Sequence, residues 1–192
     1  SELLKHLTGA DRASFLELSY PAMVNTAEHD RRVVFDARDG LYRGEQSFLD
    51  WREQTYPAWT ATDPAHIAMS RSLSTNVLHF ALLDTLATLS VERGDPTAGA
   101  RYRSWADALK QSIQRRFWLS ADGQFSAFTT TELDPSPVRR WDALGSALAV
   151  LTALPFSYEV VDRYQSAGQW DPARWPLVVT TAAFVLGLGV DG

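Results

Sequence analysis

The sequence contains no cysteine. This absence excludes disulfide bonds, zinc–thiolate sites and catalysis by a thiol. Histidine is scarce as well, and the spacing of the four histidines matches no metal-binding motif; they are His6, His29, His66 and His79. We therefore expect no metal site.

Two further classes of partner find little support in the sequence. The net charge is −5 and no segment is dense in lysine and arginine, so we expect no nucleic acid partner. The longest apolar run, at 176–190, has about fifteen residues, which is short for a membrane span and predicts a buried helix. The stretch "SELLKHLTGADR" lacks a signal-peptide pattern, and a cytoplasmic, periplasmic or secreted location stays open.

Signatures of a nucleophilic serine and of bound nucleotides are absent too. The sequence has no G-x-S-x-G motif, and no serine lies in a strand–turn–helix pattern. It has no phosphate-binding loop, and no strand–loop–helix pattern continues after "GLGVDG", so that stretch is not a dinucleotide fingerprint. We expect the protein to act without a cofactor.

The residues that are present predict a helical protein. Hydrophobic residues make up 45% of the 192 residues and charged residues 21%, a composition that supports an ordinary globular core. We expect a single all-α domain over residues 1–192, with its main helices at 11–29, 71–92, 96–117, 141–153 and 172–188. Asp11 is the expected cap of the first helix, Pro21 is expected to kink or break it, and "VVF" at 33–35 predicts a short strand.

Two of the predicted helices differ in how their apolar residues are distributed. Helix 71–92 is apolar nearly all the way round, which is typical of a helix buried on most sides. Helix 96–117 has a single apolar stripe, formed by Tyr102, Trp105, Leu109, Ile113 and Phe117. Gly94 and a capping Asp95 separate the two helices, so we expect a tight antiparallel hairpin of an inner and an outer helix.

One segment, Gly40–Trp59, combines aromatic and acidic side chains in an unusual density. It reads "GLYRGEQSFLDWREQTYPAW" and is predicted to be mostly loop. The whole chain has seven tryptophans, and aromatic faces stack on the C–H faces of sugar rings while carboxylates and arginines bind hydroxyl groups. A sugar-binding cleft is one interpretation of this segment, and packing in a core or an interface is the other.

Three motifs, in this order, resemble those of the six-hairpin (α/α)-barrel glycosidases, above all the trehalase-type enzymes. The first is the run from Glu45 to Asp50 and Trp51, "EQSFLDW", although its spacing before the aspartate differs by one residue from the family pattern. The second is Asn76 near the start of an inner helix, and the third is "FW" at 117–118 followed by "ADGQF". The resemblance covers roughly residues 11–153 and implies an (α/α)6 toroid. Such a barrel needs about twice as many helices as this chain predicts, so we expect only part of it here.

The resemblance also implies an inverting glycoside hydrolase with a pair of carboxyl groups. In that enzyme Asp50 is the general acid, and Glu159 is a candidate for the general base; the two groups would stand about 6.5–9.5 Å apart to admit a water molecule. Burial beside Leu49 and Trp51 would keep the acid protonated. The expected sugar-binding residues are Glu45, Trp51, Glu53, Trp59 and Asn76.

Structural interpretations of the same residues stay open. Asp50 is equally compatible with a helix cap, and Glu45 and Glu53 with ion pairs to nearby arginines. His79, one helical turn after Asn76, is expected to be a core histidine with a hydrogen-bond partner. At the level of function, a non-catalytic carbohydrate-binding or scaffold domain and a sugar epimerase or lyase on the same fold are the alternatives. The expected partner is an oligosaccharide or glycoside, and the oligomeric state stays open.

Overall fold

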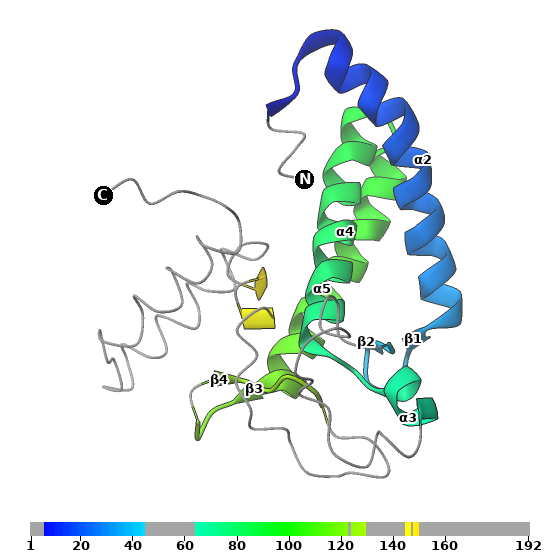
Figure 1. Ribbon diagram of the computed structural model, residues 1–192. Coiled ribbons are helices and arrows are strands. Elements are labelled where there is room, and N and C mark those ends of the chain that lie inside the picture. The colour runs from blue at the N-terminus through cyan, green and yellow to red at the C-terminus, as the bar shows by residue number, and fades with distance from the viewer. Residues whose placement is uncertain (1–5, 45–63, 123, 130–144, 147, 150–192) are drawn as a thin grey trace, which may run out of the picture. The chain divides into compact units, whose positions relative to one another are not determined.

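The computed structural model describes residues 6–44, 64–122, 124–129, 145–146 and 148–149, and these residues are mostly helical (Figure 1). This confirms the all-α prediction for the described part of the chain. The described residues fall into two compact units. Unit 1 contains the described residues up to Tyr42 together with His79–Ser112, and unit 2 contains those of Arg43–Leu78 and those from Ile113 onward.

Helix α2 (Gly9–Val33) is longer than the sequence predicts and is continuous through Pro21, so the proline does not break it. Its N-cap is Thr8 and not Asp11, which corrects that prediction; Asp11 lies in the first turn. A carboxylate there lies near the positive end of the helix dipole, and Arg31 and Arg32 in the last turn lie near its negative end. The helix therefore gains stabilisation from both ends, although Thr8 makes no side-chain cap.

Helices α4 (Leu73–Glu92) and α5 (Pro96–Phe117) agree closely with the predicted inner and outer helices. Gly94, at φ 84°, makes the turn after α4, and the Asp95 carboxylate accepts a hydrogen bond from the Ala98 amide at 2.9 Å, as a capping aspartate should. Gly99 lies close to Ala87 and Val91, and Arg103, further along α5, pairs with Asp84, earlier in α4, so the two helices run antiparallel. The predicted hairpin is thus confirmed.

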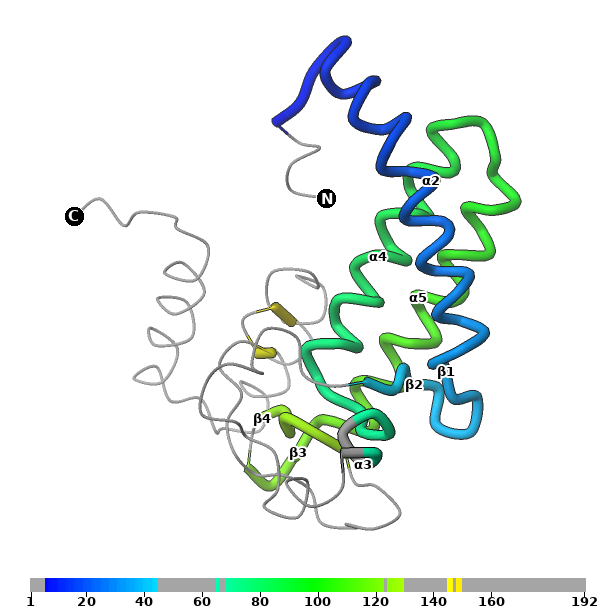
Figure 2. Tube along the Cα trace, turned by 45° about the vertical axis from the view of Figure 1, so that its right-hand side comes forward, coloured from blue at the N-terminus to red at the C-terminus, as the bar shows by residue number. Residues whose placement is uncertain are grey.

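Unit 1 is a bundle in which α2 lies beside the hairpin, as both views show (Figure 1, Figure 2). Ion pairs join the start of α2 to the end of α4, at Arg12–Glu92 and Glu17–Arg93, so these two helices are antiparallel. Glu28 of α2 pairs with Arg101 of α5. The core between the helices is mainly aliphatic and aromatic; its fully buried side chains include Leu83, Leu86, Tyr102 and Leu109.

A short β-hairpin follows α2 in unit 1. It pairs β1 (Phe35–Asp36) with β2 (Leu41–Tyr42), so the strand begins two residues later than the "VVF" prediction because Val33 still belongs to α2. Asp36 stabilises the turn, because its carboxylate accepts hydrogen bonds from the backbone N–H of Arg38 and from two nitrogens of the Arg38 guanidinium. Leu41 and Tyr42, near the start of the aromatic–acidic segment Gly40–Trp59, form a buried strand.

Unit 2 contains helix α3 (Pro64–Met69) and a second hairpin, β3 (Trp118–Leu119) with β4 (Gln124–Phe125), after the end of α5. Trp118 packs edge-on against Phe125 across the hairpin, with ring centroids 5.1 Å apart. Of the predicted helix 141–153, only 145–146 and 148–149 are described, and they are helical; the predicted helix 172–188 lies outside the described residues.

Candidate functional site

Most of the residues that the sequence predicts for the site lie outside the described part of the chain. These are both predicted catalytic carboxylates and four of the five predicted sugar-binding residues: Asp50, Glu159, Glu45, Trp51, Glu53 and Trp59. Asn76, the fifth, is described, and so is the beginning of the segment that contains Asp50. The structure therefore describes the surroundings of Asn76 and of the first residues of that segment.

Asn76 is fully buried in the first turn of α4. Its side-chain amide donates to the Ser72 carbonyl at 2.9 Å, and its backbone N–H points at the same oxygen at 3.3 Å. Ser72 is the N-cap of this helix. Its hydroxyl accepts a hydrogen bond from the Thr75 backbone N–H and donates one to the Thr75 hydroxyl. Asn76 thus stabilises the start of the inner helix, and its contact with a sugar stays a prediction.

Three chain segments meet at this helix start, and we call them the α4 junction: Gly44, Ser70–Leu73 and Ala127–Thr129. Gly44 forms a parallel bridge with Arg71, and Ser72 forms an antiparallel bridge with Phe128. Leu73 N–H donates to the Ala127 carbonyl at 2.9 Å and Thr129 N–H to the Arg71 carbonyl at 3.1 Å. Gly44 and Thr129 are therefore both hydrogen-bonded to the same short segment, Ser70–Leu73.

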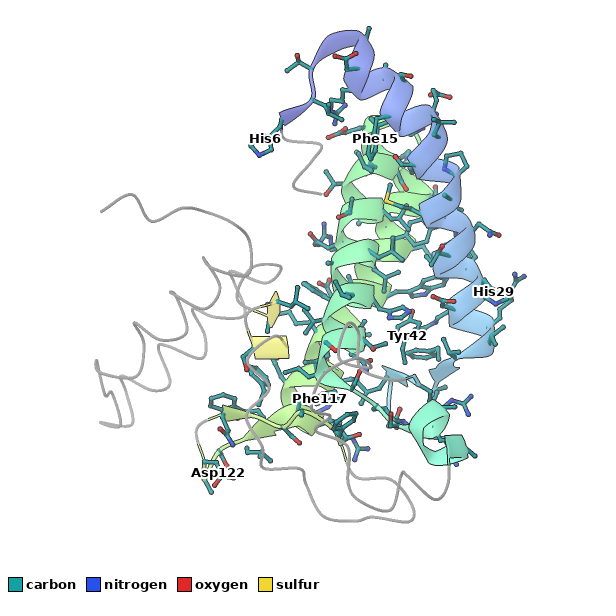
Figure 3. The ribbon with its side chains drawn as sticks, viewed as in Figure 1. His6, Phe15, His29, Tyr42, Phe117 and Asp122 are labelled. Atoms are coloured by element: carbon teal, nitrogen blue, oxygen red, sulfur yellow. The ribbon has the colours of Figure 1, made fainter. Side chains whose placement is uncertain are left out.

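His79 lies in unit 1, where it joins α4 to α2 and to β2. Its Nε2 atom is 3.1 Å from a carboxylate oxygen of Asp30, and its ring stacks on Tyr42 with centroids 4.0 Å apart and planes at 14°. Tyr42 is fully buried and lies beside α4 near the end of α2 (Figure 3). His79 thus has the polar partner that was predicted, although its side chain is half-buried and not part of the fully buried core.

The tyrosines and tryptophans of unit 1 are used to pack helices together. The Arg31 guanidinium lies 3.5 Å from the centre of the Phe35 ring and 4.8 Å from that of Trp105, so α2, β1 and α5 meet there. The Tyr102 hydroxyl donates to Glu28 at 3.0 Å. Burial raises the pKa of Tyr42 and of Tyr102, while the neighbouring Arg31 and Arg101 lower them in part. Trp105 therefore contributes to packing between helices of unit 1.

Neither the Asp30–His79 pair nor the α4 junction could be predicted from a motif or a spacing in the sequence. Asp30 and His79 are 49 positions apart, and the junction is made largely by backbone groups, which every residue carries. Within the described residues, no group of histidine and acidic side chains is arranged to hold a metal ion. No helix in that part of the chain combines the length and apolar character that a membrane crossing requires.

No protein-family model matches the sequence, and no curated protein matches it either. Inferences about function therefore rest on the residues and on their geometry.

Proposed function

We propose that the chain forms part of a six-hairpin (α/α) toroid that hydrolyses an O-glycosidic bond with inversion of configuration. The observation that carries this proposal is the α4–α5 hairpin. Its inner helix is buried on most sides, its outer helix on one, and "FW" with a short β-hairpin follows directly. The aromatic–acidic segment precedes this hairpin in the chain, which is the order of motifs in the glycosidases that the sequence resembles.

The proposed chemistry needs one protonated and one ionised carboxyl group. Asp50 donates a proton to the leaving oxygen, and a second carboxylate, with Glu159 as the candidate, activates water on the opposite face of the sugar. Aromatic neighbours such as Trp51 would disfavour the charged form of Asp50 and hold its proton near neutral pH. Trp59, Glu45, Glu53 and Asn76 complete the proposed sugar contacts.

The α4 junction contains the described residue that is nearest in sequence to the proposed acid. Gly44 is hydrogen-bonded to Ser70, three residues before α4 begins, and Asp50 follows Gly44 by six residues. Catalytic groups are most effective when they are held on rigid elements, since small displacements cost much of the rate.

The experiment is a survey of the full protein against a panel of disaccharides, oligosaccharides and aryl glycosides. We expect hydrolysis of at least one substrate, and proton NMR of the first product should show the anomer opposite to that of the substrate. Retention of configuration would contradict the inverting mechanism. Sugar binding without hydrolysis would favour a non-catalytic carbohydrate-binding domain, and conversion without bond hydrolysis would favour an epimerase or lyase.

A further inference from the structure

Two arginines from different helices of unit 1 lie around the same tryptophan ring. The guanidinium of Arg31, in the last turn of α2, is 4.8 Å from the centre of the Trp105 ring, and that of Arg101, on α5, is 5.4 Å from it. Arg31 also lies over the Phe35 ring at 3.5 Å. Like charges repel, so bringing two guanidinium groups to one ring costs free energy unless a negative charge or water compensates it.

A carboxylate compensates one of these arginines and not the other. Glu28 accepts a hydrogen bond from Nη2 of Arg101 at 2.7 Å. Within the described part of the chain Arg31 forms no ion pair with a carboxylate, and the side chain of its neighbour Asp30 is bonded to His79 on α4. The charge of Arg31 is therefore open to an anion from outside this unit.

Both guanidinium groups keep donors for such an anion. A guanidinium that stacks on a ring uses its face, while its N–H donors lie at the edge of its plane. In Arg101 the bonds to Glu28 and to the Tyr102 hydroxyl both use Nη2, and its side chain is 51% exposed. Arg31 and Trp105 are half-buried, so part of each is accessible to a ligand.

The chemistry of this patch fits a carboxylate attached to a ring. A carboxylate matches the donor geometry of a guanidinium and forms charge-assisted hydrogen bonds with it. The accessible part of the Trp105 ring offers apolar surface, on which the C–H face of a sugar packs.

We infer that Arg31, Arg101 and Trp105, which we call the Trp105 patch, bind a carboxylate-bearing sugar. The carboxylate lies between the two guanidinium groups, and the sugar ring lies against the indole. This binding site lies wholly in unit 1 and does not depend on the catalytic roles proposed for Asp50 and Glu159, so it goes beyond the proposed function.

The test is a titration of the full protein with three small molecules, followed by the NMR signal of the Trp105 indole N–H. Glucuronate carries both the carboxylate and the sugar ring, glucose only the ring, and acetate only the carboxylate. Trp105→Phe assigns the signal, because it alone removes that indole. Arg31→Gln and Arg101→Gln each remove one guanidinium of the patch.

Arg93→Gln is the matched control. Arg93 also lies over an aromatic ring, that of Tyr20, at 4.9 Å, but it is paired with the carboxylate of Glu17 at 3.0 Å. It therefore shares the stacking of the patch arginines and differs from Arg31 in having a carboxylate partner.

We expect glucuronate to shift the indole signal saturably with a millimolar Kd, since exposed ion pairs contribute modestly to affinity. Arg31→Gln and Arg101→Gln should each weaken binding about 10-fold or more, the factor for a lost hydrogen bond between charged groups. Arg93→Gln should leave the affinity unchanged. Glucose and acetate should both bind more weakly than glucuronate, and raising the salt from about 0.1 M to about 1 M should weaken glucuronate binding.

Four results would each overturn the inference: no saturable shift with glucuronate, glucose or acetate binding as tightly as glucuronate, an affinity in Arg101→Gln equal to that of wild type, and an equal loss in Arg93→Gln. Should Arg31→Gln fail to fold, Arg101→Gln decides, because the Arg101 side chain is half-exposed. If the protein cleaves no glycoside, the proposed function fails and the binding result stands by itself.

Discussion

The helices α4 and α5 are neighbours in one hairpin, yet they meet the rest of the protein in different ways. Of the α4 residues, only Thr88, Val91 and Glu92 are exposed. Helix α5 is buried along one stripe, which contains Tyr102, Leu109, Ile113 and Phe117, and exposes charged residues such as Arg101 and Asp107. The difference shows that α4 is packed on most of its sides, whereas α5 is packed on one side and exposed on the other.

The two helices also approach each other unusually closely at one point. A Cβ atom added to Gly99 of α5 would lie 2.6 Å from a methyl carbon of Val91 and 2.9 Å from the Ala87 carbonyl oxygen. A side chain at this position would therefore force the backbones apart. The hairpin depends on this glycine as well as on its apolar stripe.

The largest expected effect contrasts the two faces of α5. Ala106 is completely buried, whereas Ala108, two residues later, is exposed. Ala106→Asp should lower the free energy of unfolding by about 4 kcal/mol or more, because it buries an unpaired carboxylate. Ala108→Asp should change it by less than about 0.5 kcal/mol. Urea denaturation of both variants measures the difference, and equal losses would mean that α5 is not an outer helix with one buried stripe.

The next effect tests the close approach at Gly99. Helix propensity alone predicts that Gly99→Ala stabilises α5 by about 1 kcal/mol. The contact with the Ala87 carbonyl predicts the opposite sign, a loss of about 1–3 kcal/mol from overpacking. The free energy of unfolding from a denaturant titration decides between the two, and a more stable variant would show that the helices are less tightly packed than described.

The smallest effect concerns the buried tyrosines on the two sides of the hairpin, Tyr42 against α4 and Tyr102 on α5. Burial raises the pKa of both above 10, so the folded state keeps their protons at pH values where the unfolded state has begun to release them. Stability should therefore be complete below pH 10 and fall as the pH rises above 10.

Tyr42→Phe and Tyr102→Phe should each remove part of that alkaline loss, because phenylalanine has no proton to release. The measurement is the free energy of unfolding between pH 8 and pH 11 for the wild type and both variants. Identical pH profiles in all three proteins would show that these tyrosines are more accessible to water than their burial indicates.

The pattern of apolar residues was sufficient to predict α4 and α5, because periodicity reports how many sides of a helix are covered. It was also sufficient for the turn at Gly94 and the Asp95 cap, which are local in sequence. The prediction failed at Asp11 and at "VVF", where helix α2 begins earlier and ends later than the local signals indicate. Tertiary contacts along α2, such as Asp30 with His79, stabilise turns that propensity alone leaves undecided.

The candidate site was harder to predict than the fold. Tyr42 belongs to the aromatic–acidic segment by composition, but it is a buried strand residue stacked on His79. The pairing of Gly44 with Ser70 and Arg71 uses backbone groups and one serine hydroxyl, and neither the composition nor a motif predicts it. The catalytic roles of acidic residues such as Asp50 remain predictions, which rest on the resemblance and on chemistry.

The measurement that tests the proposed function most directly is the activity of Asp50→Asn in the full protein. The amide keeps the shape of the carboxyl group but delivers no proton, so kcat on a natural glycoside should fall about 10²-fold to 10⁴-fold with little change in KM. Aryl glycosides, whose leaving groups need less protonation, should be hydrolysed much nearer the wild-type rate. Cleavage of the natural glycoside by Asp50→Asn at the wild-type rate would contradict the assignment of Asp50 as the general acid.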